Sequence, residues 1–196
     1  MNLLGKMIVF DGMDRAGKTT ALFSLSEHLI KEHKVKIITT DKLIGNRIPS
    51  LVGHYPDEVV YMLFWQAIRE TELTQIQPVL DLGGIALVDR HYLSNLAYDW
   101  WEDLDSDFKH TMDILYLSRC MQPDMLFLFT IPFEKFVERD DGDTKLDRHL
   151  FEAIQSGYLW WARKLENDGV DIIYIDGSSP MDEVAARVLL EVTERL

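Results

Sequence analysis

The chain has 196 residues, of which 47% are hydrophobic and 27% charged, a balance that suits one globular domain with a full core. Its formal net charge of −13 argues against binding to nucleic acids or membrane surfaces, because both are polyanions. The single cysteine, Cys120, excludes an internal disulfide and a zinc site built from several thiolates. A small phosphorylated ligand stays compatible with this charge, since it needs only a local basic cluster.

The first six residues lead directly into an apolar run and lack the pattern of a secretory signal. No apolar segment approaches the 18 or more residues of a membrane span, and we find neither a linker nor an internal repeat. We therefore expect one cytosolic domain over residues 1–196, with no membrane partner.

Short apolar runs alternate with runs of helical period along the chain. This pattern predicts strands over residues 6–11, 35–40, 85–88, 125–131 and 170–175. It predicts helices over residues 18–31, 58–81, 93–101, 106–121, 132–139, from about 146 to 169, and 181–196. Residues 41–53 are interpreted as a loop with a short helix, and the acidic residues 140–144 as a loop.

Five strands alternating with helices favour a parallel sheet with helices on both faces. Ligands of such sheets bind beyond the carboxyl ends of the strands. Residues 12–19, 40–42 and 89–90 all follow predicted strands directly, and the basic residues of the chain gather there. The sequence therefore predicts a binding site at this edge.

Residues 12–19 follow the pattern Gly-x-x-x-x-Gly-Lys-Thr between a predicted strand and a predicted helix. Glycines permit backbone angles that turn successive N–H groups toward phosphate oxygens, and the following helix points its positive N-terminus at the same place. Lys18 would reach the β- and γ-phosphates and Thr19 would hold Mg²⁺. The alternative is a glycine-rich turn before a surface helix. The residues expected to contact ATP here are Gly12, Asp14, Ala16, Gly17, Lys18, Thr19 and Thr20.

Other segments accompany this motif in a fixed order. They are Trp65-Gln66-Ala67-Ile68-Arg69, Val88-Asp89-Arg90-His91 with Ser94 and Ala97-Tyr98, Gln122-Pro123-Asp124 and Leu146-Asp147-Arg148. Together with residues 10–20 they resemble thymidylate kinases over nearly the whole chain. The resemblance implies a three-layer P-loop kinase fold with a five-stranded parallel sheet, a small lid at about residues 139–148, and a homodimer. It also implies phosphoryl transfer from ATP·Mg²⁺ to a deoxynucleoside monophosphate, with dTMP as the first expectation.

The catalytic residues follow from what phosphoryl transfer requires, namely two phosphates held in line with their charge neutralised. Asp89 is placed to hold a water of the Mg²⁺ shell, with a structural ion pair as the alternative. Arg90 would bind the acceptor phosphate through its planar fork. Arg15 would bridge donor and acceptor, with a solvent-facing loop arginine as the alternative. Arg148 is the lid candidate for the same task, and Arg139 would contact ATP.

The acceptor contacts are implied by resemblance. Asp14 would bind the sugar 3′-hydroxyl, Trp65 would stack on the base and Arg69 would hydrogen-bond it. Trp65 and Arg69 are four residues apart and share a helix face, which also fits a core tryptophan beside a surface arginine. Ser94 and Tyr98 complete the expected set.

Three segments depart from the family pattern: residues 39–42, the residues after the Ala-Tyr pair, and the acidic residues 140–144, whose simplest interpretation beside a triphosphate is a solvated loop. Residues 39–42 are shorter and lack a proline, so Lys42 or Arg47 would replace an arginine for the acceptor phosphate. Asp99 follows the Ala-Tyr pair, and a carboxylate near the base edge would prefer a donor such as an exocyclic amine.

The first two departures favour a first rival hypothesis, in which the same chemistry acts on another or modified deoxynucleoside monophosphate or on a nucleoside. A second rival is a nucleotide-binding protein without turnover, against which the intact Lys18, Thr19, Asp89 and Arg90 count. A third, a purely structural α/β module, leaves the basic residues at the strand ends unexplained.

Overall fold

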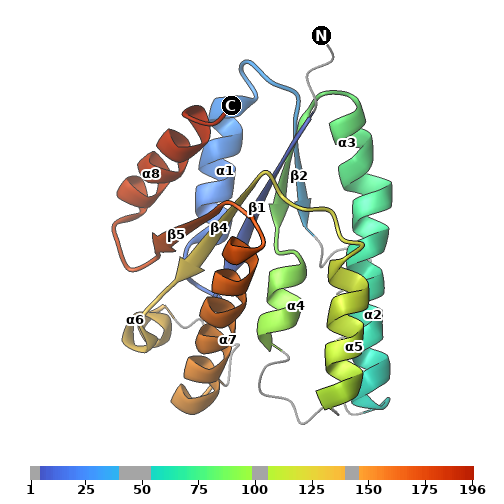
Figure 1. Ribbon diagram of the computed structural model, residues 1–196. Coiled ribbons are helices and arrows are strands. Elements are labelled where there is room, and N and C mark those ends of the chain that lie inside the picture. Colours follow the sequence, from blue (N-terminus) through green and yellow to red (C-terminus); the bar gives the residue numbers. More distant parts are fainter. Residues whose placement is uncertain (1–4, 40–53, 99–105, 140–145) are drawn as a thin grey trace.

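The computed structural model describes residues 5–39, 54–98, 106–139 and 146–196. Five parallel strands form one sheet in the order β2-β3-β1-β4-β5 (Figure 1). The strands are β1 (Lys6–Gly12), β2 (Val35–Thr39), β3 (Ile85–Asp89), β4 (Met125–Thr130) and β5 (Ile172–Asp176). The five predicted strands and their parallel arrangement are confirmed.

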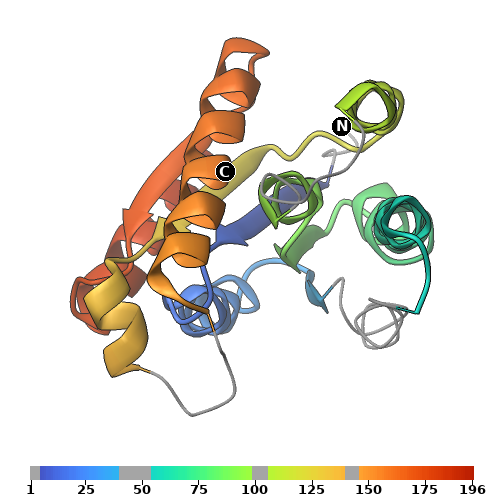
Figure 2. The same cartoon turned by 90° about the horizontal axis from the view of Figure 1, so that it is seen from below.

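Helices cover both faces of this sheet. They are α1 (Lys18–Leu29), α2 (Asp57–Thr71), the π-helix η3 (Glu72–Ile76), α3 (Gln77–Asp81), α4 (Tyr92–Tyr98), α5 (Ser106–Leu117), α6 (Phe133–Glu138), α7 (Arg148–Asn167) and α8 (Met181–Thr193). Helix α1 packs beside α8 and against β1, β2 and β3, whereas α4 packs against α7 and β1 on the other face (Figures 1 and 2). The three-layer α/β fold is thereby confirmed. Over the described ranges, no helix combines the length and the apolar character that a membrane span requires.

The core is centred on β1 and β4, whose apolar side chains are almost completely buried. The rings of Phe10 and Phe127 stack with their centroids 5.2 Å apart. Burying one such side chain contributes about 1.5–3 kcal/mol, so the continuous apolar runs of these strands hold the sheet between its helix layers.

The predicted helix over residues 58–81 is interrupted by a π-helical turn. Within η3 the N–H of Gln77 donates to the carbonyl oxygen of Glu72, five residues earlier. Pro78 lacks an N–H and cannot continue the regular ladder, and it stands at the start of α3. Periodicity alone does not detect this one-residue change of register.

Helix ends differ from the expected ones by a few residues. Helix α5 ends at Leu117 instead of residue 121, and α8 ends at Thr193. Helix α7 begins at Arg148 because the Asp147 carboxylate accepts the N–H of Leu150 at 2.8 Å, which confirms Asp147 as its cap. The loops expected over 41–53 and 140–144 lie outside the described residues, as do residues 99–101.

Strand β1 enters its loop at the centre of the sheet through Gly12, which has a φ of 124°. A Cβ atom on this residue would lie 2.1 Å from the carbonyl oxygen of Phe129 on β4. Only glycine therefore lets the chain leave β1 this close to β4, and this exit places residues 13–17 over the strand ends.

Candidate active site

A cleft of about 550 Å³ opens beyond the carboxyl ends of β1 and β3. It is lined by Asp14, Arg15, Gly17, Lys18, Thr19, Thr20, Asp89, Arg90, Arg139 and Met181. The fold thus brings together most of the residues predicted to handle phosphate, from Asp14 to Arg139 along the chain. Met181, at the start of α8, is the one lining residue that the sequence did not suggest.

Lys18 is buried and anchored to the loop that it closes. Gly17 caps α1 in the left-handed conformation, and the Nζ of Lys18 donates to the carbonyl oxygens of Gly12 (3.0 Å) and Met13 (2.7 Å). Burial, followed by the positive charge of Arg90, lowers the pKa of Lys18 to about 8. An incoming phosphate would supply the negative charge that this ammonium group lacks.

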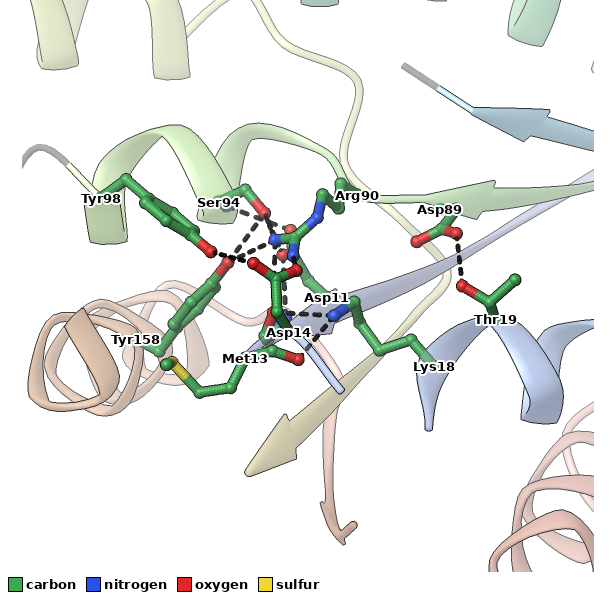
Figure 3. A network of polar contacts seen from close by, with 11 residues as sticks. Asp11, Met13, Asp14, Lys18, Thr19, Asp89, Arg90, Ser94, Tyr98 and Tyr158 are labelled. Atoms are coloured by element: carbon green, nitrogen blue, oxygen red, sulfur yellow. Dashed lines mark hydrogen bonds and ion pairs between the residues drawn. The ribbon is translucent and has the colours of Figure 1, made fainter. Parts of the chain in front are cut away.

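Thr19 and Asp89 meet at the mouth of the cleft. The Thr19 hydroxyl donates to an Asp89 carboxylate oxygen at 3.1 Å (Figure 3). Among the described residues no group of three or more carboxylate, histidine or cysteine side chains could hold a metal by itself. A lone hydroxyl and carboxylate fit Mg²⁺, which binds through one or two protein oxygens together with phosphates and water.

Arg15 and Arg139 connect the loop after β1 to α6 and to the turn after β5. Arg15 has a φ of 62°, and its guanidinium lies 4.7 Å from the ring centroid of Phe136 on α6. Arg139 donates to the carbonyl oxygens of Arg15 and Gly177, both at 2.9 Å. It therefore ties the phosphate loop to the turn after β5. A Cβ at Gly177 would lie 2.3 Å from the carbonyl oxygen of Ala16, so these two backbones touch.

Arg90 is the centre of a polar network that joins β3, α4, α7 and the loop after β1 (Figure 3). Its Nη2 pairs with the Asp14 carboxylate, and its Nη1 donates to the Ser94 hydroxyl at 2.8 Å and the Tyr158 hydroxyl at 2.9 Å. The Tyr98 hydroxyl donates to the other Asp14 oxygen at 3.0 Å. Arg90 also has a positive φ of 65°, an uncommon conformation that the surrounding contacts hold in place.

Asp14 keeps its negative charge in this setting. Burial by itself would raise its pKa, but the charges of Arg90 and Lys18, together with hydrogen bonds from Tyr98 and Arg90, lower it below the usual value. The carboxylate is an acceptor that could bind a sugar hydroxyl, and it competes with any incoming phosphate for Arg90.

Asp11 supports this network from beneath and was missed by the sequence reasoning. It is fully buried, and its carboxylate accepts the N–H groups of Gly12 (2.9 Å), His91 and Ser94 (both 3.1 Å), as well as the Ser94 hydroxyl. The available signal was a carboxylate that directly follows four buried apolar residues, where burial without partners would be costly.

The two predicted base contacts lie away from the lining of the cleft. Trp65 has no exposed surface and stacks on Tyr116 of α5, with ring centroids 5.2 Å apart and an angle of 5° between the planes. Arg69 pairs with the buried Glu72. In this arrangement neither side chain presents a free face or fork to a base, and their contact with the acceptor stays a prediction.

Glu72 is a second residue that sequence reasoning missed. Its carboxylate accepts the N–H of Met121 at 2.8 Å and lies 3.0 Å from the Nε2 of His91, in addition to its pair with Arg69. An acidic residue at an interior position of a predicted helix was the only signal. Through these contacts Glu72, at the start of the π-helical turn, links α2 to Met121 before β4 and to His91 before α4.

Arg148 stands apart from the cleft in this structure. It is half exposed at the start of α7, pairs with Glu134 at 2.6 Å, and lies 4.4 Å over the ring of Phe133. The structure therefore does not bring it to the phosphate loop, and its role in the lid stays a prediction. Lys42 and Asp99 lie outside the described residues.

Comparison with known proteins decides the family. A family model described as "Thymidylate kinase" matches residues 10–188. The chain belongs to the thymidylate kinase family. It is therefore a nucleoside monophosphate kinase by family, with ATP as the implied phosphoryl donor, and the resemblance seen in the sequence is confirmed.

Several curated relatives carry matching names. The thymidylate kinase of Prochlorococcus marinus (strain NATL2A) is 30% identical over 174 residues, which cover 79% of this chain and 82% of the relative. A probable thymidylate kinase of Archaeoglobus fulgidus is 31% identical over 188 residues, 93% of this chain and 92% of the relative. Probable thymidylate kinase 1 of Saccharolobus solfataricus is 25% identical over 200 residues, which cover 97% of this chain and 98% of the relative.

The lowered pKa of Lys18 predicts a pH limit on ATP use. The free enzyme should lose the ammonium charge of Lys18 as pH rises through about 8, because burial and the nearby charge of Arg90 disfavour the protonated form. Since kcat/KM reports on the free enzyme, its value for ATP should be level below pH 7.5 and fall by about tenfold between pH 8.5 and 9.5.

Steady-state rates across pH 6.5–9.5 check this expectation. A Lys18→Arg variant stays cationic over the whole range and should show lower activity without the alkaline fall. A level profile in the unmodified enzyme would contradict the assignment of the charge to Lys18.

Proposed function

We propose that this chain transfers the γ-phosphoryl group of ATP to the 5′-phosphate of dTMP, giving ADP and dTDP. In this reaction an oxygen of the dTMP phosphate forms a bond to the γ-phosphorus as the bond to the β,γ-bridging oxygen breaks. The observation that carries the proposal is the position of Arg90, which lines the same cleft as Lys18 and its loop. A donor cradle and an acceptor arginine in one cleft are what in-line transfer requires.

The donor side uses residues 12–20. Backbone N–H groups of the loop and the N-terminus of α1 would hold the phosphates, and Lys18 would move from its carbonyl partners to the β- and γ-phosphates. Mg²⁺, held by Thr19 and through water by Asp89, would supply charge neutralisation between these phosphates. Arg139 would act on ATP indirectly, since it fixes the backbone of Arg15.

The acceptor side uses the network around Arg90. The phosphate of dTMP would take the fork of Arg90 from Asp14, which frees the Asp14 carboxylate to accept the 3′-hydroxyl of the sugar. Tyr98 and Ser94 hold these two groups in place. We propose that the base lies toward α2, which carries Trp65 and Arg69, and that binding requires Trp65 to leave its stack on Tyr116.

The direct test is ADP release from ATP·Mg²⁺ over a panel of nucleoside monophosphates and nucleosides. We expect dTMP to give the highest kcat/KM, and Lys18→Ala to abolish turnover with every acceptor. Lys36→Ala, an exposed lysine on β2, is the matched control and should leave the rates unchanged.

Each other outcome of the panel replaces the proposal. Turnover led by another acceptor would establish the first rival, in which residues outside the described part, such as Asp99, set the base preference. Binding of ATP without turnover would establish the second rival.

Arg15 is proposed to stabilise charge in the transition state, because its side chain lines the cleft beside Lys18. Arginines in this role raise rates by about 10³–10⁵. Arg15→Ala should therefore lower kcat at least a hundredfold, with a change in the KM for ATP of only a few-fold. Arg187→Ala, an exposed arginine on α8, should behave as the unmodified enzyme in the same assay. An unchanged kcat in Arg15→Ala would remove this residue from the mechanism.

We further propose that the chain acts as a homodimer in the cytosol. Leu63 and Phe64 of α2 are only partly buried where they pack on the buried Val60 and Ala67, separate from the main core, and Tyr55 just before α2 is 54% exposed. Burial of this surface against a second copy would remove it from water. Equilibrium sedimentation should give twice the mass of one chain, and the mass of one chain would refute the dimer.

A further inference from the structure

Tyr158 is a buried polar residue that the proposed mechanism leaves without a role. It lies on α7, ten residues after Arg148, with no exposed surface. Its hydroxyl reaches across to the start of α4, 2.9 Å from the Nη1 of Arg90 and 2.8 Å from the Ser94 hydroxyl (Figure 3). Helix α7 therefore makes a direct polar contact with the arginine expected to bind the acceptor phosphate.

The direction of each hydrogen bond follows from its neighbours. The one proton of the Ser94 hydroxyl goes to the Asp11 carboxylate, so Ser94 can only accept from its other partners. The Tyr158 hydroxyl must then donate to Ser94, and its lone pair accepts the N–H of Arg90. Burial raises the pKa of Tyr158 well above its ordinary value despite the opposing charge of Arg90, so the hydroxyl keeps this proton.

These contacts fix the orientation of a guanidinium that could otherwise rotate. The Nη1 of Arg90 is directed by Tyr158 and Ser94, while its Nη2 faces Asp14. The ring of Tyr158 also packs edge-on against Tyr98, at 6.1 Å between centroids, and Tyr98 in turn lies 5.7 Å from the guanidinium carbon of Arg90. The Nη1 of Arg90 also donates to the Gly12 carbonyl oxygen at 3.3 Å, so removal of the Tyr158 hydroxyl would leave it held by Ser94 and by this longer bond, and the guanidinium would be less firmly oriented.

We propose that Tyr158 is a positioning residue for the acceptor phosphate: its hydroxyl holds the fork of Arg90 in the orientation that receives this phosphate. The inference rests on the proposed function, because it takes Arg90 to bind the acceptor. It assigns no contact between Tyr158 and substrate. It also gives α7, which carries Arg148 at its exposed end, a part in binding the acceptor.

The test compares an acceptor with its phosphate-free counterpart. Tyr158→Phe removes only the hydroxyl and keeps the ring that fills the core. Calorimetric titration should show dTMP bound about tenfold more weakly by this variant, because a hydrogen bond to a charged group is lost, whereas thymidine should bind within twofold of the unmodified enzyme. A residue that merely supports the fold would weaken both ligands alike.

Two further proteins sharpen the result. Tyr174→Phe removes a hydroxyl that bonds to Glu166 near the end of α7, outside the lining of the cleft, and it should leave both affinities unchanged. In an Arg90→Lys background, which lacks the fork, Tyr158→Phe should cause no additional loss of dTMP binding. An additional loss equal to that in the unmodified enzyme, or equal weakening of dTMP and thymidine, would overturn the inference.

The proposed function can fail separately. If the unmodified enzyme prefers another nucleoside monophosphate, dTMP is not its substrate, and the same comparison is made with that nucleotide and its nucleoside. The ratio of the two affinities then supports or overturns the role of Tyr158 regardless of the base.

Discussion

The structure depends on one buried carboxylate. Asp11 ends the apolar run of β1 and accepts four hydrogen bonds, three of them from the turn and the helix that follow β3. A buried charge is stable only with such a complement of donors, so the end of β1 and the start of α4 must meet here. Because Arg90 lies inside that turn, the same four bonds fix the position of Arg90 relative to Lys18. The loop that carries Lys18 and the turn that carries Arg90 are therefore held together by the same carboxylate.

Lys18 and Arg90 already have polar partners before any ligand enters the cleft. Lys18 is satisfied by backbone carbonyl oxygens and Arg90 by Asp14, although the chain as a whole carries a net charge of −13. Two anionic substrates would therefore exchange partners with the protein rather than fill bare cationic sites. Such an exchange would favour ligands that carry phosphate, because a neutral molecule cannot replace the interactions of Lys18 and Arg90 that it would break.

Sequence reasoning predicted the five strands, their parallel arrangement and the phosphate loop, because each of these leaves a local pattern of period or spacing, but it did not predict the order of the strands in the sheet. It placed Thr19 and Asp89 at one edge because parallel strands end together. It missed the contacts of Asp11, Glu72 and Tyr158, because most of their partners lie tens of residues away and the local signals are weak. Trp65 shows the same limit, since a helix period cannot distinguish a ring facing a ligand from one stacked on Tyr116.

Helix α7 connects the exposed Arg148 rigidly to the buried Tyr158. Ten residues separate Arg148 at its exposed end from Tyr158, a span of about 15 Å of rigid helix. A displacement of the start of α7 along its axis would move the Tyr158 hydroxyl relative to Arg90 and Ser94. Occupation of one substrate site would then alter the affinity of the other, and thermodynamic linkage requires that the effect be equal in both directions. The order in which nucleotides enter and leave would follow from this mechanical connection.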